Sequence, residues 1–227
     1  MYNGIVVVDK PKGFTSHDIV LFLRRRFGIK KVGHAGTLDP MATGVLVLLL
    51  GDATKLSNSF ISDDKEYEGT MRLGAKTTTC DAEGEITATN DISGVTPKII
   101  EEAASHFRAT IDQVPPMFSA LKRGGRKLYK LARKGIEIEL EPRKVTVFAL
   151  DIKKIELPDV WFKVACSKGT YVRKLAEDIG EKIGCGAHLV ALRRTKSGRF
   201  SIEDAVGFEA LKNYSEMELE RRLIRLR

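Results

Sequence analysis

The chain has 227 residues and a formal net charge of +8, from 38 Lys and Arg against 30 Asp and Glu. A composition that is 43% hydrophobic and 30% charged excludes a disordered chain and predicts a globular fold. The longest apolar run, residues 45–50, is far shorter than the ~20 residues that span a bilayer, so no membrane helix is expected.

Secretion and metal-based chemistry are not supported either. The apolar stretch that ends at Asp9 has no basic segment before it, unlike a secretory signal, so we expect a cytoplasmic protein. The three cysteines are far apart and form no CxxC pair, which argues against a disulfide framework and against a zinc site: Cys80, Cys166 and Cys185.

Alternating and helical hydrophobic patterns follow each other along the chain without the regular βαβ order of a parallel sheet. The expected strands are residues 4–9, 45–50, 67–73, 145–149, 160–166 and 187–194. The first expected helix begins at Ser16 as its N-cap and ends at Gly28, and residues 33–44 are expected to form a long loop. Later helices begin at Thr96 and near Thr170. The pattern predicts an α+β protein with a mixed, mostly antiparallel sheet.

Basic residues gather in three clusters that contain no acid. Each cluster alone is compatible with a solvated face, but like charges on one folded surface repel each other unless a polyanion neutralises them. Nucleic acid is therefore the expected partner. The clusters are Arg24, Arg25, Arg26, Lys30 and Lys31; Lys122, Arg123, Arg126, Lys127, Lys130, Arg133 and Lys134; and Arg193, Arg194, Lys196 and Arg199.

One carboxylate stands out because of its surroundings. Asp39 lies in the glycine-rich segment GHAGTLDPMATG, directly before a strongly apolar strand. Pro40 biases Asp39 toward an extended conformation, so the carboxylate is held on stiff backbone. A plain Asp-Pro turn is the alternative interpretation of this spacing.

Further strings of residues accompany this loop in a fixed order. They are DKPKG, KEY, QVPPMFSALK, SKGTYVR and GCGAHL, beginning at residues 9, 65, 113, 167 and 184. Together with the Asp39 loop they resemble the TruB family of tRNA pseudouridine-55 synthases, from residue 4 to about residue 200. The resemblance implies the pseudouridine synthase fold, a curved sheet flanked by helices. It also implies a catalytic domain over residues 1–205 with a basic, RNA-gripping insertion near residues 113–140, and a short helical tail over residues 206–227.

The activity that this resemblance implies is the conversion of uridine to pseudouridine at position 55 in the T-loop of tRNA. The N-glycosidic bond is broken, the flipped-out uracil turns, and it is rejoined through carbon by a monomer that needs no cofactor and no metal. The resemblance assigns the essential carboxylate to Asp39, acting as nucleophile or as base. Arg173 keeps that carboxylate ionised and aimed, and Tyr67 stacks on uracil with its hydroxyl near the carbon that loses a proton.

Other positions are assigned to substrate binding by the same resemblance. His34 stacks in the gap that the flipped base leaves, Tyr171 and Leu192 line the pocket, and Lys10 supports it. A surface role for His34, core packing for Tyr67, Tyr171 and Leu192, and an exposed phosphate contact for Arg173 are the alternatives. The expected RNA contacts of the insertion are Lys122, Arg123, Arg126, Lys127, Lys130 and Arg133.

Two departures from the family pattern leave other functions open. The chain has no room for the PUA-type C-terminal domain common in bacterial members, and Thr78 stands where an acid is usual. A non-catalytic RNA-binding or RNA-folding module is one alternative. A guide-RNA-dependent subunit that resembles dyskerin is the other.

Overall fold

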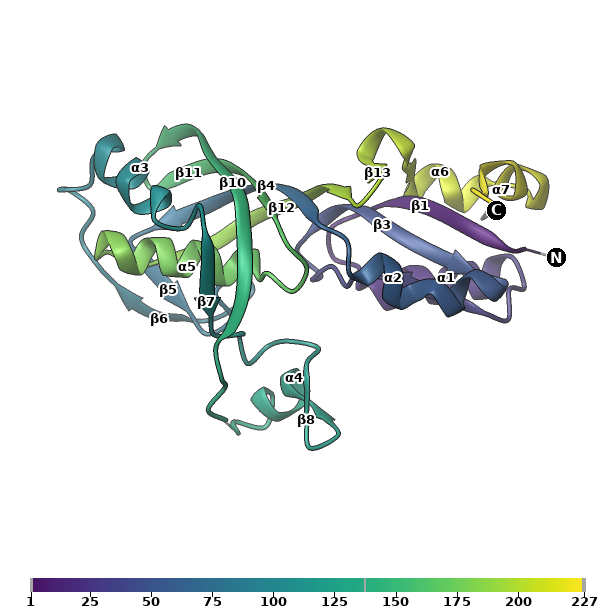
Figure 1. Ribbon diagram of the computed structural model, residues 1–227, viewed down its shortest axis with the longest axis horizontal. Helices are drawn as coiled ribbons and strands as arrows, with labels where there is room; N and C mark the ends of the chain where they lie inside the picture. The colour runs from purple at the N-terminus through teal and green to yellow at the C-terminus, as the bar shows by residue number, and fades with distance from the viewer. Residues whose placement is uncertain (1, 137, 226–227) are drawn as a thin grey trace. The chain divides into compact units, whose positions relative to one another are not determined.

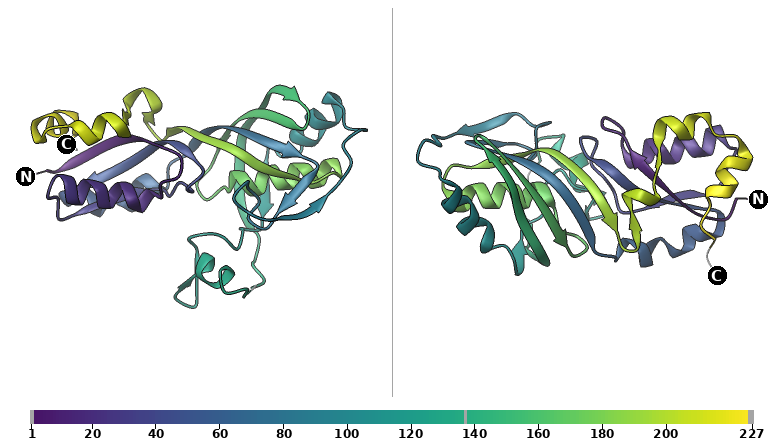
Figure 2. Two further views of the ribbon diagram at one scale, coloured as in Figure 1. Left: turned by 180° about the vertical axis from the view of Figure 1, so that it is seen from behind. Right: turned by 90° about the horizontal axis from the view of Figure 1, so that it is seen from above.

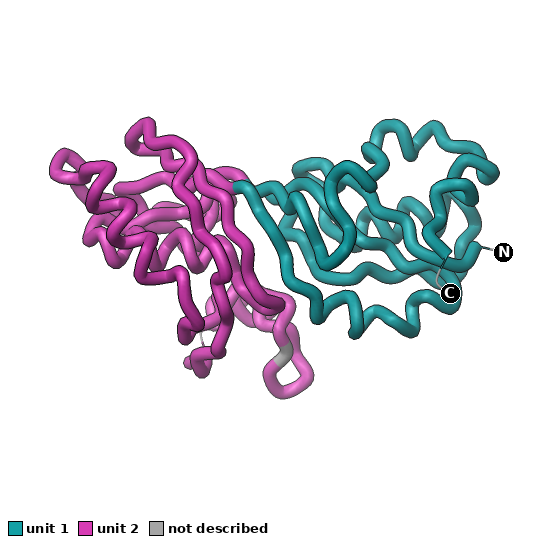
Figure 3. The backbone as a smooth tube through the Cα atoms, turned by 45° about the horizontal axis from the view of Figure 1, so that its top comes forward, with its two compact units in different colours: residues 1–68, 192–227 teal, residues 69–191 magenta. Residues whose placement is uncertain are grey.

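The computed structural model describes residues 2–136 and 138–225, and it consists of two compact units (Figure 3). Unit 1 combines residues 1–68 with residues 192–227, so the beginning and the end of the chain fold together. Unit 2 comprises residues 69–191.

The main sheet is mixed and mostly antiparallel (Figure 1). Its strands are β1 (Gly4–Lys10), β2 (Val32–Ala35), β3 (Thr43–Leu50), β4 (Lys65–Leu73), β7 (Thr110–Gln113), β10 (Arg143–Glu156), β11 (Asp159–Cys166), β12 (Ala187–Ser197), β13 (Phe200–Ser201) and β14 (Val206–Gly207). The strand order is β14-β1-β3-β12 in unit 1, with β2 on β3 and β13 on β12, and β12-β4-β11-β10-β7 in unit 2. Only β1–β14 and β3–β12 are parallel among the pairs whose register is described. The predicted α+β class is confirmed.

One buried cluster in the core of unit 1 is formed by alternate residues of β1 and β3, and the intervening residues of both strands are buried as well. Ile5 and Val7 of β1 lie beside Val45 and Val47 of β3 in one buried cluster that includes Phe200. The alternation follows from the strand period of two, which sends successive side chains to opposite faces. The helices of this unit are α1 (Ser16–Arg26), η1 (Gly51–Leu56), α2 (Ser57–Ile61), η2 (Ile202–Asp204), α6 (Phe208–Asn213) and α7 (Glu216–Arg222).

Helix α1 begins one residue earlier than the sequence predicts. The N-cap is Thr15, whose hydroxyl accepts the N–H of Asp18 at 3.1 Å while the Asp18 carboxylate accepts the N–H of Thr15 at 2.8 Å. The prediction that Ser16 is the cap is wrong, because this reciprocal capping box satisfies the first turn without it. Ser16 is buried instead, and its hydroxyl is available to the Asp39 loop.

Residues 33–44 are not the single long loop that the sequence predicts. Val32–Ala35 form β2, which pairs antiparallel with β3 from Leu50 to Val47. The expectation was wrong because this strand is only four residues long and buries a single side chain, Ala35, so no alternation marks it. The remaining loop, residues 36–42, is short and carries Asp39 between two paired strands.

Unit 2 places two helices beside its strands (Figures 1 and 2). Helix α3 (Pro97–Ser105) begins at the predicted N-cap Thr96, and α5 (Val172–Ile183) ends at the predicted Gly184. The two helices lie next to each other. A separate two-stranded sheet is formed by β5 (Ala75–Thr77) and β6 (Ile86–Thr89).

The predicted insertion connects the paired strands β7 and β10 (Figure 1). It contains β8 (Lys122–Arg123), β9 (Arg126–Lys127) and α4 (Leu128–Ala132). Two of its apolar residues, Leu128 and Leu131, are buried, so this basic segment has a small apolar centre of its own.

The C-terminal segment belongs to unit 1. Strand β14 pairs with β1, and Ile5 and Ile224 exchange backbone hydrogen bonds of 2.9 and 2.8 Å. Leu211 and Leu219 of α6 and α7 are fully buried. This segment is therefore packed against β1. Residues 226 and 227 lie outside the described residues.

Candidate active site

The loop that carries Asp39 is fixed from two sides by buried polar groups. Before Asp39, the hydroxyl of Ser16 accepts the N–H of Leu38 at 2.8 Å and donates to the carbonyl of Leu38 at 3.2 Å. After it, the carbonyl of Pro40 accepts the N–H of Gly13 at 2.8 Å. The half-buried carboxylate of Asp39 is therefore attached to backbone that is held on both flanks.

Lys10 is the central support of this arrangement. Its side chain is fully buried at the end of β1, and its ammonium group donates to the carbonyls of Pro11 at 2.9 Å, Phe14 at 2.6 Å and Pro40 at 3.4 Å. A buried ammonium is tolerated only when such acceptors surround it. Lys10 thus connects the turn after β1 to the residue that follows Asp39, which is a positioning role.

Arg194 holds the same loop from β12. Its side chain is fully buried and donates to the carbonyls of Val45 at 2.7 Å and Gly36 at 3.1 Å. Gly44, at a φ of +100°, lies so close that an added Cβ would be 2.2 Å from the carbonyl oxygen of Arg194. Arg194, although part of the third basic cluster, is therefore buried rather than exposed to solvent. Its neighbour Arg193 is paired with Asp9 at 2.7 Å.

Three more predicted residues belong to unit 1. Tyr67 lies on the buried face of β4 and is 8% exposed, as its alternation with polar neighbours predicts. Leu192 on β12 is half-buried, and its carbonyl accepts the hydroxyl of Thr43 at 3.4 Å. His34 is half-buried on β2, in the strand that leads into the Asp39 loop.

Arg173 lies in unit 2, on the first turn of α5. It is only 5% exposed, which excludes the exposed phosphate contact that the sequence left open. Its guanidinium donates to the carbonyls of Phe118 at 2.5 Å and Thr79 at 3.2 Å, and lies 3.7 Å from the carboxylate of Asp81. The guanidinium carbon also lies 5.9 Å from the centre of the Tyr171 ring.

Asp81 belongs to a compact turn that the sequence analysis did not link to Arg173. The carboxylate accepts the hydroxyl of Thr79 at 2.5 Å and the N–H of Glu83 at 3.0 Å. Thr78, which replaces the usual acid, is exposed, and its hydroxyl accepts the N–H of Glu85 at 3.2 Å. Thr78 thus closes the outer side of the turn, while Asp81 faces Arg173.

Tyr171 is half-buried and is the N-cap residue of α5. No side chain caps the helix there. Its backbone is held by Gln113, the last residue of β7, which the sequence analysis noted only as part of a motif. A side chain bonded to a backbone 58 positions away leaves no local signal in the sequence.

The structure brings the predicted residues together in two groups. Unit 1 holds Lys10, His34, Asp39, Tyr67 and Leu192, and unit 2 holds the others.

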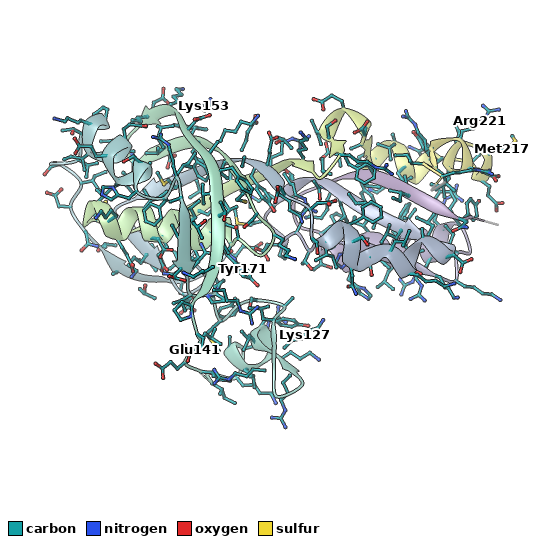
Figure 4. The ribbon with its side chains drawn as sticks, viewed as in Figure 1. Lys127, Glu141, Lys153, Tyr171, Met217 and Arg221 are labelled. Carbon is teal, nitrogen blue, oxygen red and sulfur yellow. The ribbon has the colours of Figure 1, made fainter. Side chains whose placement is uncertain are left out.

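The basic residues of the insertion whose side chains are described are exposed, and the side chain of Lys122 lies outside that description. Lys127, labelled in Figure 4 together with Tyr171, and Arg133 both lie over the ring of Tyr129. The exposed predicted contacts are Arg123, Arg126, Lys127, Lys130 and Arg133.

The described residues contain neither a metal-binding cluster nor a membrane-spanning helix. No group of three or more His, Cys, Asp or Glu side chains among them could hold a metal ion. No helix within residues 2–136 and 138–225 is long and apolar enough to cross a membrane.

Comparisons with known proteins identify the family and the fold of this chain. Residues 24–172 match the family described as TruB family pseudouridylate synthase (N terminal domain), and residues 173–226 match the tRNA pseudouridylate synthase B C-terminal domain. The fold is similar to a chain in the crystal structure of a Cbf5-Nop10-Gar1 complex, with a TM-score of 0.77 and 30% identity. That match covers 98% of this chain and 60% of the other. The fold is that of the pseudouridine synthases.

Two relatives of known name show which family of pseudouridine synthases the chain belongs to. The tRNA pseudouridine synthase B of Syntrophotalea carbinolica is 50% identical over 210 residues, which are 92% of this chain and 69% of the relative. That of Opitutus terrae is 48% identical over 222 residues, which are 98% of this chain and 92% of the relative. The chain belongs to the TruB family.

Proposed function

We propose that this protein is an isomerase that converts uridine to pseudouridine in tRNA, at position 55 of the T-loop. The observation that carries the proposal is the Asp39 loop, in which the buried side chains of Lys10, Ser16 and Arg194 fix the backbone around one half-buried carboxylate. Such rigidity suits a reaction in which one group must meet a flipped nucleotide in a fixed orientation.

The reaction needs no second substrate. The bond between N1 of uracil and C1′ of ribose breaks, a bond between C5 and C1′ forms, and the proton leaving C5 is balanced by one taken up at N1. Asp39 acts as nucleophile or base on this path, and Tyr67 packs against uracil with its hydroxyl near C5. Arg173, which lies 3.7 Å from the carboxylate of Asp81, is the positively charged residue that the family resemblance assigns to the reaction.

The remaining residues serve RNA binding in this proposal. His34 stacks in the gap left by the flipped uridine, and Tyr171 and Leu192 each contribute to substrate binding. The exposed basic residues of the insertion contact phosphates of the T-arm. The enzyme works as a cytoplasmic monomer.

A guide-RNA-dependent subunit is the second candidate, because the fold resembles a chain from a Cbf5-Nop10-Gar1 complex at 30% identity. The relatives at about 50% identity are named as tRNA enzymes instead. A non-catalytic RNA-binding module is disfavoured, since Asp39, Tyr67 and Arg173 are all present.

The test is incubation of the purified chain alone with an unmodified tRNA transcript, followed by carbodiimide labelling and primer extension. One stop at position 55 supports the proposal, and a transcript with cytidine at that position is the matched control. Product that forms only after a guide RNA and partner proteins are added would favour the second candidate. Binding without product under both conditions would favour the non-catalytic module. Light scattering of the free protein tests the monomer.

A further inference from the structure

Gln113 bonds the backbone of Tyr171 with both ends of its side-chain amide. The amide oxygen accepts the N–H of Tyr171 at 2.9 Å, and the amide nitrogen donates to the carbonyl of Tyr171 at 3.2 Å. Gln113 is 2% exposed, so water does not compete for these groups. The side-chain amide of glutamine supplies both the donor and the acceptor that this contact needs at the end of β7.

The residue that Gln113 holds lies at the start of the helix that bears Arg173. Tyr171 is the N-cap of α5, where no side-chain cap fixes the first turn. Its ring lies beneath the guanidinium of Arg173, with 5.9 Å between the guanidinium carbon and the ring centre. The two hydrogen bonds from Gln113 therefore hold the first turn of α5 and the Tyr171 residue in place.

Gln113 is also the last residue of the strand that leads into the basic insertion. Its backbone pairs with Arg143 on β10, and the insertion begins with the next residue. The insertion makes a second contact with the same helix turn, because the carbonyl of Phe118 accepts a bond from Arg173. Gln113 thus belongs to the strand that leads into the insertion and also holds the first turn of α5, which carries Tyr171 and Arg173.

We infer that Gln113 is a positioning residue for the isomerisation. From the end of β7, where the basic insertion begins, it holds Tyr171 and Arg173 in the positions that catalysis needs. The inference rests on the proposed function. Gln113 does not touch the reacting atoms. Its loss lowers the rate of the chemical step through the placement of Tyr171 and Arg173, and it leaves tRNA affinity nearly intact.

The first measurement uses the fact that Gln113 is the only glutamine in the chain. Protein labelled with ¹⁵N in the glutamine side chain gives one amide pair by NMR. We expect this pair to exchange with solvent at least about tenfold more slowly than that of free glutamine, because both ends are buried and bonded. Exchange at the rate of free glutamine would overturn the inference without any reference to activity.

The second measurement compares kcat and KM of variants. Gln113→Leu removes both bonds and should lower kcat by about 10–100-fold, the range expected for a displacement of about 1 Å, while KM changes by less than about threefold. Gln113→Glu keeps the size and the bond to the Tyr171 N–H but sets an oxygen against the Tyr171 carbonyl, so its kcat should lie between those of the parent and the Leu variant. If the Leu variant does not fold, the Glu variant alone decides.

Asn90→Ala is the matched control, because its side-chain amide donates to the carbonyl of Cys185 at 3.0 Å in the same unit. Its kcat should stay within about twofold of the parent. An unchanged kcat for folded Gln113→Leu and Gln113→Glu, or an equal loss in Asn90→Ala, would overturn the positioning role. A parent protein that makes no pseudouridine would instead refute the proposed function.

Discussion

Replacing Lys10 by methionine isolates the contribution of the buried ammonium to the Asp39 loop. Methionine nearly fills the same volume but donates no hydrogen bond. The change removes the Lys10 donor from three carbonyls, of which Pro40 keeps the bond from the N–H of Gly13 at 2.8 Å, so the main losses are at Pro11 and Phe14. Leaving a buried acceptor without its donor costs about 1–3 kcal/mol.

We therefore expect Lys10→Met to lower the free energy of unfolding by about 2 kcal/mol, which corresponds to a drop in Tm of roughly 4–8 °C for a chain of this size. The single-turnover rate on tRNA should fall about 10–100-fold, because the backbone beside Asp39 loses a support. Thermal unfolding followed by circular dichroism and a single-turnover assay measure the two effects. Lys12→Met is the matched control, since Lys12 is exposed two residues away. Equal stability and equal rates in the two variants would refute the role assigned to Lys10.

Three further predictions concern other parts of the molecule. Tyr67→Phe keeps the buried ring, so tRNA affinity should stay within about 1 kcal/mol while the single-turnover rate falls about 10²–10⁴-fold; a parent-like rate would remove the hydroxyl from the chemistry. Replacing Lys127, Lys130 and Arg133 together should reduce the salt dependence of tRNA binding by roughly 2–3 units of slope, at about 0.7–0.9 per lost phosphate contact, and an unchanged slope would mean a merely solvated face. Burial raises the pKa of the Cys80 thiol to about 12, so at pH 8 iodoacetamide should modify it about 10³-fold more slowly than a free thiol by mass spectrometry; equal rates would contradict that burial.

The elements with local signals were predictable from the sequence. Helix α3 has its Thr96 cap, and α5 has a helical apolar period that ends at Gly184. Strand β4 alternates from Tyr67 to Leu73. In each case the residues that define the element are neighbours in the chain, so propensity, capping and periodicity report it directly.

The supports of the site were not predictable, because they depend on distant pairing. Nothing local distinguishes Arg193 from Arg194, and only the parallel pairing of β3 with β12 buries the second and leaves the first to pair with Asp9. Gln113 and Ser16 likewise act on backbone far along the chain. Asp39 itself was found through the family resemblance, since an Asp-Pro turn fits its spacing equally well.

The most direct test of the central claim compares the parent protein with Asp39→Asn on the same tRNA transcript, with binding and product measured side by side. The variant keeps the size of the side chain and removes its charge, so the loop stays supported by Lys10 and Ser16. We predict that affinity for tRNA remains within about 1 kcal/mol while no pseudouridine forms at position 55. Product formation by Asp39→Asn within tenfold of the parent rate would contradict the assignment of the reaction to this carboxylate.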